Sequence, residues 1–506
     1  MDWNLERRYL HAMGSSQRFD RWLSTVRVRG RCTFRNPSVF GRGRWRLLVS
    51  GPSLFVFAIA VLGCGPDPES QRAQDPRPNV LLISVDTIRA DHLSAYGYSR
   101  ETSPFLSELA RDGIQVQTAY APSATTGPTH ASVFTAQPPM AHGVRKNGQP
   151  LPEKEVTLAE RLAEIGFETG AVVSSYVLSD RFGYSQGFNF FDDDFSKSKA
   201  PVGSTVWEGE VIEERFYGRA DDTTDRALRW LENRSDQAVP FFLFVHYFDP
   251  HDPYIPPETF TPPFAPGRKE SLKLNRSIYL YDWLIAYTDQ QIGRLLRGLD
   301  LAGLSEDTLV IVTGDHGEGL MSHGHMFHGL HVYEEAVRVP LILRWPGQLP
   351  SNLKVERPFP LVDLAPALLE LIGDSPTGPL ASAGSASRLL GEADLIEEET
   401  PIFLYRRHYA DAEGEAGETQ PRGEKFGVRL GGWKMIVGPD EGTLELYNLA
   451  ADPAEKDNLV SEEPERVAKL LALVDAWRLE HERDRFDPPV LPPQDRERLK
   501  ALGYVE

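Results

Sequence analysis

The chain has 506 residues, of which 41% are hydrophobic and 25% charged, which is enough for one or two domains with a sizeable core. Its formal net charge is −19, although the first 46 residues hold eleven Arg against three acidic residues, so the remainder is more acidic still. This acidic body argues against a nucleic-acid partner, which needs a basic face. It is compatible with an anionic substrate, because a bound metal ion reverses the local field.

The first segment, residues 1–64, has the pattern of an export signal. Three arginines between residues 42 and 46 precede an apolar run over 47–62, which is short for a membrane span and is interrupted by Pro52. The segment resembles a bacterial lipoprotein signal, which implies that Cys64 becomes the acylated first residue of the mature chain. The protein is then expected in the bacterial cell envelope, lipid-anchored and facing the periplasm or exterior. A cleaved signal of a soluble exported protein is the alternative.

Residues 65–78 are rich in Pro and charge and are predicted to form a flexible tether. Residues 79–373 are predicted to form a catalytic domain of alternating strands and helices, and therefore a largely parallel sheet covered by helices on both faces. The Cys32 and Cys64 thiols precede this domain, so it has no disulfide framework. The predicted strands cover residues 80–85, 116–121, 170–173, 240–246, 308–312 and 339–343, and the predicted helices cover 103–110, 157–162, 225–233, 277–301 and 362–372.

Three further segments complete the chain. Residues 374–398 are rich in Gly, Ser, Ala and Pro and are predicted to be a linker. Residues 399–485 contain short strand-like runs followed by a helical pattern over 464–478, which predicts a smaller α+β subdomain. Residues 486–506 are predicted to form a tail.

Within the catalytic domain, residues 181–222 have no clear periodicity and are predicted to be an insertion or active-site loop.

A candidate nucleophile, Thr126, lies at a predicted strand-to-helix turn. Pro128 suits the first turn of a helix, since its missing N–H has no partner there. The N–H groups and dipole at such a helix start favour a phosphate or sulfate oxyanion. Thr is also a common helix cap, so the pattern alone is not diagnostic.

Two acidic motifs that follow apolar runs favour Thr126 as a nucleophile over Thr126 as a helix cap. Asp86 comes after the run at 80–85, and the pair Asp315-His316 comes after the run at 308–312. A hydroxyl nucleophile together with potential metal ligands at strand ends is the arrangement that metal-assisted hydrolysis needs. The alternative is that Asp86 forms a strand-end turn and His316 lies in a surface loop.

The combined motifs resemble the sulfatase family, within the alkaline phosphatase superfamily. The resemblance covers residues 78–482 and rests on PNVLLISVDTIRADH (78–92), HYFDPHDPY (246–254), GDHGE (314–318) and ELYNL (445–449). It implies an alkaline phosphatase-like α/β fold with a large, mostly parallel sheet flanked by helices and a smaller C-terminal α+β subdomain. It also implies that Asp86, Asp315 and His316 bind a divalent cation that Thr126 reaches as well. Oxygen ligands suit Ca²⁺, Mg²⁺ or Mn²⁺, and an imidazole shifts the preference toward Mn²⁺ or Zn²⁺.

The chain departs from classical sulfatases at four positions of this pocket. Thr126 stands where those enzymes have a Cys or Ser that is converted to formylglycine, and Thr cannot be converted in the same way. His130 replaces an expected Arg, and His328 replaces a Lys. An expected Lys-x-His is absent, with Ser174-Ser175-Tyr176 in its place.

The motif Thr126-x-Pro128-x-His130 instead resembles the nucleophile motif of the nucleotide pyrophosphatase/phosphodiesterases of the same superfamily. In that branch a metal activates the Thr hydroxyl for attack on phosphorus, which its high pKa otherwise prevents. The stretch HGVRKN (142–147) is similar to the same branch and suggests Asn147 as an oxyanion donor. A turn role for Asn147 before Gly148 is the alternative.

A set of histidines completes the candidate site. By resemblance, His246 and His328 contact the transferred group and are predicted to be catalytic, whereas His130 and His251 are predicted to bind substrate. Asp249 or His251, together with His328, could alternatively hold a second metal ion. His323 and His325 belong to the same His-rich region, and each of these residues could instead be a structural histidine.

The sequence therefore predicts an exported, metal-dependent sulfatase-family hydrolase that uses one or two divalent cations (Ca, Mg, Mn or Zn). The expected partners are the membrane, through a lipid anchor, and an anionic ester substrate such as a sulfated or phosphorylated glycan, lipid or small molecule. A phosphate ester is favoured over a sulfate ester because Thr126 replaces the formylglycine precursor. Two alternatives are a binding protein that holds a sulfo- or phosphoglycan without cleaving it, and a phosphoryl-group transferase acting on a surface glycan or lipid.

Overall fold

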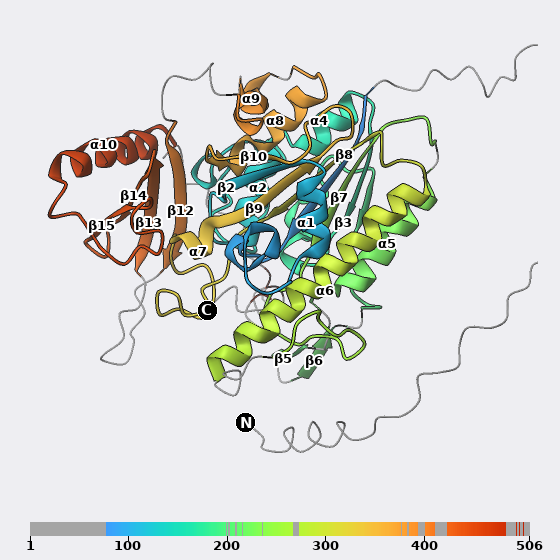
Figure 1. Ribbon diagram of the computed structural model, residues 1–506, viewed down its shortest axis with the longest axis horizontal. Coiled ribbons are helices and arrows are strands. Elements are labelled where there is room, and N and C mark those ends of the chain that lie inside the picture. Colours follow the sequence, from blue (N-terminus) through green and yellow to red (C-terminus); the bar gives the residue numbers. More distant parts are fainter. Residues whose placement is uncertain are drawn as a thin grey trace, which may run out of the picture. The chain divides into compact units, whose positions relative to one another are not determined.

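The computed structural model describes residues 77–481, except 199, 201–202, 208–209, 215, 235, 267–272, 376, 382–383, 393–399 and 410–421, and also residues 492, 495 and 499 (Figure 1). The predicted export signal, Cys64 and all but the last two residues of the predicted tether lie outside this part of the chain. In the part that is described, no helix combines the length and the apolar character needed to cross a bilayer.

A nine-stranded sheet forms the centre of the catalytic domain, with strand order β10-β2-β9-β8-β1-β7-β3-β4 and β11 paired to β2. Its strands pair in parallel, except that β9 runs antiparallel to both β2 and β8. The central strands are continuous apolar runs, which is the pattern of strands buried on both faces. The strands are β1 (Asn79–Val85), β2 (Ile114–Tyr120), β3 (Glu168–Val172), β4 (Phe190–Asp192), β7 (Phe241–Tyr247), β8 (Thr308–Gly314), β9 (Arg338–Arg344), β10 (Leu353–Val355) and β11 (Phe359–Pro360).

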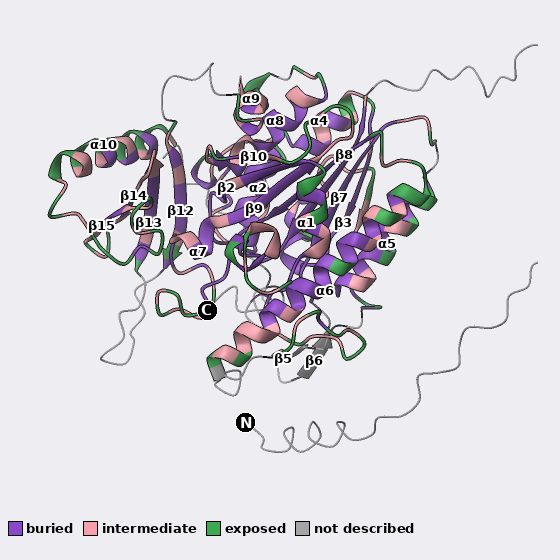
Figure 2. Ribbon diagram, viewed as in Figure 1, coloured by how far each residue is buried: buried purple, intermediate pink, exposed green. Residues whose placement is uncertain are grey.

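Helices cover both faces of this sheet, and the core is divided accordingly (Figures 1 and 2). Alternate residues of β1 point to opposite faces, so that Val80 and Leu82 pack in one apolar cluster and Leu81 and Ile83 in the other. The first cluster contains residues of α2 (Thr126–Thr135), α4 (Leu158–Glu164) and α8 (Leu364–Leu371). The second contains residues of α1 (Pro104–Arg111), α5 (Ala220–Glu232) and α6 (Lys273–Leu301).

Shorter helices connect these layers. The α-helical ones are α3 (Pro139–His142), α7 (Glu334–Val337) and α9 (Ser385–Leu389). Single 3-10 turns are η2 (Ala90–His92), η3 (Ser94–Tyr96), η4 (Tyr176–Leu178), η5 (Asp180–Phe182), η6 (Leu361–Asp363) and η7 (Gly378–Leu380).

A four-stranded antiparallel sheet follows, in the order β12-β13-β14-β15, with helix α10 (Pro464–His481) packed on it. The strands are β12 (Ile402–Tyr409), β13 (Gly423–Leu430), β14 (Trp433–Gly438) and β15 (Thr443–Asn448). The N–H of Tyr405 in β12 donates to the Pro122 carbonyl, just ahead of α2. The predicted fold class, a mostly parallel α/β sheet with a smaller C-terminal α+β subdomain, is confirmed.

Two regions contain structure that the sequence pattern does not reveal. The stretch 181–222 includes the edge strand β4 and the hairpin of β5 (Gly203–Trp207) and β6 (Glu210–Glu214). Strands of three to five residues are too short for a periodicity to be recognised. The predicted linker 374–398 includes α9, in which Leu389 is buried against the main core.

The start of helix α4 is held by a reciprocal cap. The Thr157 hydroxyl accepts the Glu160 N–H at 3.1 Å, and the Glu160 carboxylate accepts the Thr157 N–H at 2.8 Å. Because alanine leaves the Glu160 N–H without that acceptor, Thr157→Ala is expected to lower the free energy of unfolding by about 1 kcal/mol. Denaturant titration of both proteins measures this, and an unchanged midpoint would contradict it.

The buried carboxylate of Asp289 is expected to make stability fall with rising pH. It accepts the N–H groups of Phe105 and Leu106 at the start of α1, and burial raises its pKa to about 7. An unfolded Asp titrates near 4, so the folded state binds the proton more tightly between about pH 4 and 7. Folding therefore loses stability across that window. When the pH is raised from 5 to 7.5, the free energy of unfolding of Asp289→Asn is expected to fall by about 2 kcal/mol less than that of the parent. The same substitution at the exposed Asp300, on the same helix, should leave the parent's pH dependence intact.

Candidate active site

The candidate site lies at the carboxyl ends of three neighbouring strands. Asp86 follows β1, Asp315 follows β8 on one side of it, and His246 lies near the end of β7 on the other side. In the pairing register, Ser84 is opposite His246 and Val85 is opposite Gly314. Parallel strands bring their carboxyl ends to one edge, so three residues far apart in the chain meet there. All three side chains are at most 1% exposed.

Asp86, Asp315 and His316 form a group whose donor atoms lie within 4.8 Å of one another. The His316 Nε2 atom is 3.6 Å from Asp86 Oδ1 and 3.6 Å from Asp315 Oδ2. Both carboxylate oxygens of Asp86 and the Oδ2 atom of Asp315 are buried, and the described residues provide no hydrogen-bond partner for them. Buried carboxylate oxygens normally have partners, and these point to a cation as the missing one.

The backbone around this group fixes its geometry. Asp315 Oδ1 accepts the N–H groups of Thr87 at 3.2 Å and His316 at 2.7 Å, which leaves Oδ2 directed elsewhere. The His316 Nδ1 atom donates to the Gly317 carbonyl at 2.9 Å, so that Nε2 faces the two carboxylates. Thr87 has a φ of 53°, an unfavourable conformation for a β-branched residue that is common at functional sites.

The electrostatics of the site favour neutral side chains unless a cation is present. Burial, together with the neighbouring Asp315 and Glu318 carboxylates, raises the pKa of Asp86 well above its usual range. Burial also raises the pKa of Asp315 to about 6 and lowers that of His316 to about 3. A divalent cation would stabilise the ionised carboxylates and bind a neutral imidazole, so the donor set fits such an ion.

Thr126 is the first residue of α2 and is completely buried. Its Oγ1 atom lies 3.2 Å from His316 Nε2, which places the hydroxyl beside the carboxylate group. The next residue, Gly127, donates its N–H to Asn147 Oδ1 at 2.7 Å and accepts the Tyr184 hydroxyl at 2.7 Å. A Cβ at Gly127 would lie 3.1 Å from both side chains, which explains the glycine. The Asn147 Nδ2 group is buried with no acceptor among the described residues, so it is available to donate to an oxyanion.

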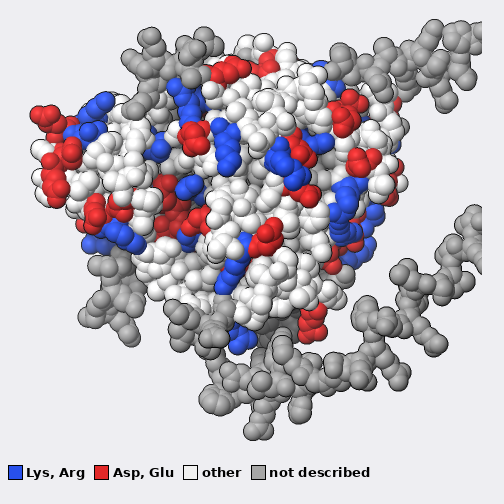
Figure 3. Space-filling view, viewed as in Figure 1, with Lys and Arg blue, Asp and Glu red and all other residues white. Residues whose placement is uncertain are grey.

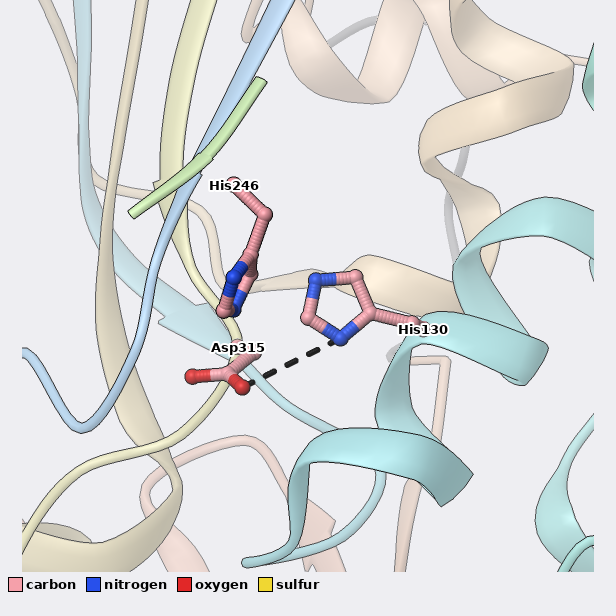
Figure 4. Close-up of side chains that lie close together, drawn as sticks. All are labelled: His130, His246 and Asp315. Carbon is pink, nitrogen blue, oxygen red and sulfur yellow. Dashed lines mark ion pairs between the residues drawn. The ribbon is translucent and has the colours of Figure 1, made fainter. Parts of the chain in front are cut away.

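His130 and His246 stand next to each other over the Asp315 carboxylate (Figure 4). The His130 Nδ1 atom is 3.9 Å from Asp315 Oδ2, and the two imidazole rings are 5.2 Å apart and nearly perpendicular. The His246 Nε2 atom is 3.8 Å from Asp86 Oδ2. Burial lowers the pKa of both histidines, so that both are neutral at pH 7.

His328 and His251 extend the site away from the sheet. The His328 ring lies 4.5 Å from the His316 ring and 5.0 Å from the His251 ring. Burial lowers the pKa of His328 to about 4 and that of His251 to about 3. All nine residues predicted from the sequence therefore belong to one connected cluster. Asp86, Thr126, His130, Asn147, His246, His251, Asp315, His316 and His328 each contact another member or, for Asn147, the residue next to Thr126.

The other acidic and histidine candidates have structural partners. Asp249 accepts the Ala220 N–H at 2.9 Å and forms an ion pair with Arg219 at 3.4 Å. His323 lies 2.6 Å from Glu335, and its ring stacks on Tyr333 rather than on the cluster. The proposed alternative in which Asp249 holds a second metal is therefore not favoured by this arrangement.

Several residues of the site were not predicted from the sequence. Ser84 hydrogen-bonds to His130 Nε2 at 2.9 Å, and Tyr184 holds Gly127 as described. Glu318 is completely buried, lies 3.4 Å from His328 and accepts the Tyr254 hydroxyl at 3.0 Å. Ser84 and Glu318 have a sequence signal, because they lie in the motifs PNVLLISVDTIRADH and GDHGE, whereas Tyr184 owes its position to the tertiary fold.

The comparisons with known proteins agree with this architecture. The family model described as Sulfatase matches residues 78–374, and that described as N-sulphoglucosamine sulphohydrolase, C-terminal, matches residues 322–477. The chain is 23% identical to an N-acetylglucosamine-6-O-sulfatase of Bacteroides thetaiotaomicron over 82% of this chain and 88% of that protein.

Two solved structures show the same fold. One, a protein in complex with its substrate D-glucosamine-2-N,6-O-disulfate, has a TM-score of 0.63 and 20% identity, covering 82% of this chain and all of that one. The other, a phosphonate monoester hydrolase of Agrobacterium radiobacter, has a TM-score of 0.62 and 22% identity, covering 80% and 96%. With a family model that spans more than half of its length and strand-end carboxylates gathered at one edge of the sheet, the chain belongs to the sulfatase family.

Proposed function

We propose that this protein is an exported, metal-dependent hydrolase that cleaves sulfate or phosphate esters with Thr126 as the nucleophile. The observation that carries the proposal is the Thr126 hydroxyl, which lies 3.2 Å from His316 Nε2, beside the two Asp86 carboxylate oxygens and Asp315 Oδ2, for which the described residues provide no hydrogen-bond partner. Asp86, Asp315 and His316 would hold a divalent cation, which lowers the pKa of a nearby hydroxyl and offsets the charge of a tetrahedral anion.

In the first half of the reaction, the Thr126 oxygen bonds to the sulfur or phosphorus of the ester, and the bond from that atom to the alcohol oxygen breaks. The hydroxyl proton is transferred to the departing alcohol, so the products are the free alcohol and a sulfated or phosphorylated Thr126. The His328 imidazole, whose ring lies 4.5 Å from that of His316, is a candidate for passing that proton on. Asn147 Nδ2 would donate to an oxygen of the transferred group.

In the second half, water attacks the same sulfur or phosphorus and the bond to Thr126 breaks. Thr126 regains its proton, and sulfate or phosphate leaves with the remaining proton. His130 and His251 would line the space taken by the substrate.

The family membership supports a sulfate ester as substrate, and the relatives suggest a sulfated sugar. One relative is named an N-acetylglucosamine-6-O-sulfatase, and one similar structure holds a glucosamine disulfate. The preference for a phosphate ester remains a prediction that rests on Thr126 replacing the formylglycine precursor. Sulfate monoesters and phosphate diesters both carry one negative charge, so the same site is chemically able to accept either.

A direct test uses the purified protein, freed of metal with a chelator and assayed with 4-nitrophenyl sulfate, 4-nitrophenyl phosphate and bis-4-nitrophenyl phosphate. Turnover is expected to fall to background after chelation and to return on adding Mn²⁺, Zn²⁺ or Ca²⁺. The ratio of kcat/KM values between the esters decides the substrate preference. Binding of a sulfated sugar without hydrolysis under any of these ions would favour the binding-protein alternative instead.

Export and lipid attachment at Cys64 remain proposals that rest on the N-terminal sequence alone. Labelling bacterial cells with a radioactive fatty acid is expected to mark the parent protein but not Cys64→Ser. Incorporation of label into the Cys64→Ser protein would contradict acylation at this position.

A further inference from the structure

His246 is a fully buried histidine for which the described residues provide no hydrogen-bond partner. Its side chain is 0% exposed, and neither Nδ1 nor Nε2 makes a hydrogen bond. Leaving a buried polar atom without a partner is costly, and an imidazole offers two such atoms. The nearest acidic atom is Asp86 Oδ2, 3.8 Å from Nε2, which is too far for a hydrogen bond. This arrangement indicates that a further group, such as a cation, binds the His246 imidazole.

The same imidazole belongs to a second group of potential ligands. Donor atoms of His130, His246 and Asp315 lie within 4.8 Å of one another, and all three side chains are buried. Figure 4 shows both rings next to the Asp315 carboxylate, with His130 directed toward one of its oxygens. Asp315 is also part of the Asp86–Asp315–His316 group, so two potential cation sites share one carboxylate.

The charges of the site support two cations rather than one. Three carboxylates are fully or almost fully buried here, on Asp86, Asp315 and Glu318. His130 stands where the family resemblance predicts an arginine. A permanent positive charge has thus been replaced by an imidazole, which is a metal ligand only when neutral.

We propose that His130, His246 and Asp315 hold a second divalent cation, distinct from the one at Asp86, Asp315 and His316. The inference deepens the proposed function, on which it rests for the identity of the first site. Two imidazoles and one carboxylate favour Zn²⁺ or Mn²⁺ over Ca²⁺.

Ligation by His130 requires a change in where its proton lies. Its Nδ1 is 2.8 Å from the Thr126 carbonyl, which only accepts, so Nδ1 carries the proton and Nε2 accepts from Ser84 Oγ at 2.9 Å. When Nδ1 binds an ion, its hydrogen bond to the Thr126 carbonyl is broken and the proton moves to Nε2, which then donates to Ser84 Oγ. Such a second hydrogen bond commonly orients a metal-binding histidine. The Ser84 hydroxyl both donates and accepts, so it serves either state.

The test is the metal content of the full chain, stripped with a chelator, dialysed against Zn²⁺ and measured by mass spectrometry after removal of free ion. The parent is expected to hold two equivalents, and His246→Gln one. His130→Arg, which restores the arginine of the resemblance, is also expected to hold one. A parent that holds one equivalent, or a folded His246→Gln protein that holds two, would overturn the second site.

A matched control is His142→Gln. His142 is equally buried, but its ring nitrogens hydrogen-bond to the Ser132 hydroxyl at 3.0 Å and the Val144 N–H at 3.0 Å. This variant is expected to keep two equivalents. Circular dichroism establishes that each variant is folded, and the parent's stoichiometry decides the question even if a variant is not.

The outcomes separate this inference from the proposed function. One equivalent in the parent, with ester turnover that depends on Thr126, overturns only the second cation. Two equivalents that fall to one in His246→Gln, with turnover independent of Thr126, overturn only the nucleophile. Cobalt substitution adds an independent readout, because the parent's visible absorption at two equivalents should differ from that of His246→Gln at saturation.

Discussion

Replacing Thr126 by alanine is expected to reduce ester turnover by at least about 10³-fold, because the substitution removes the attacking oxygen. The hydroxyl is completely buried and lies 3.2 Å from His316 Nε2, so no neighbouring group can take its position without a rearrangement. The fold should be retained, since Thr126 contributes no cap to α2; its N-cap is Thr125. The measurement is kcat/KM for a 4-nitrophenyl ester at saturating metal.

Two companion variants make the result interpretable. Thr126→Ser keeps a hydroxyl at the same position and is expected to retain measurable turnover. Thr129→Ala removes another fully buried threonine from the same helix, whose hydroxyl donates to the Ser123 carbonyl at 2.9 Å. It is expected to lose stability but not activity per folded molecule. Parental turnover in Thr126→Ala would eliminate Thr126 as the nucleophile.

Site residues that directly follow a buried strand are the ones whose approach can be predicted from the sequence pattern. Asp86 and Asp315 each follow a continuous apolar run, and parallel strands bring such positions to one edge of a sheet. The approach of His130 to His246 has no such local signal. It depends on β7 pairing with β1 in a register that places His246 opposite Ser84, and on α2 lying over that edge.

In the fold, too, the sequence pattern predicts individual strands but not how they pair. The apolar stretch at 339–343 predicts a buried strand, and β9 is one, but its direction cannot be read from its residues. β9 runs antiparallel between β2 and β8 and begins directly after α7. Likewise β4 pairs with the sheet through only three residues, too few for a pattern.

Lys434 is expected to be the most important single charge for the stability of the C-terminal subdomain. It lies in β14 with no exposed surface, and its Nζ atom is 3.0 Å from Glu334 Oε1 and 3.0 Å from Glu455 Oε1. Burial raises the pKa of Glu455 to about 7, and the ammonium group of Lys434 opposes that rise. Removing the ammonium group leaves the buried Glu455 carboxylate and the half-buried Glu334 carboxylate without this counter-charge. Lys434→Met is therefore expected to lower the free energy of unfolding by about 3–5 kcal/mol.

Denaturant titration of Lys434→Met at pH 8, above the pKa of about 7 of Glu455, measures this cost. The double variant Lys434→Met/Glu455→Gln is expected to recover a substantial part of it, because one of the two uncompensated charges is gone. Lys469→Met, at an exposed position of α10, provides the matched control and should change stability by less than about 0.5 kcal/mol. Equal stabilities for the parent and Lys434→Met would contradict the predicted cost. The Lys434 ammonium group would then contribute nothing to holding β14 against α7.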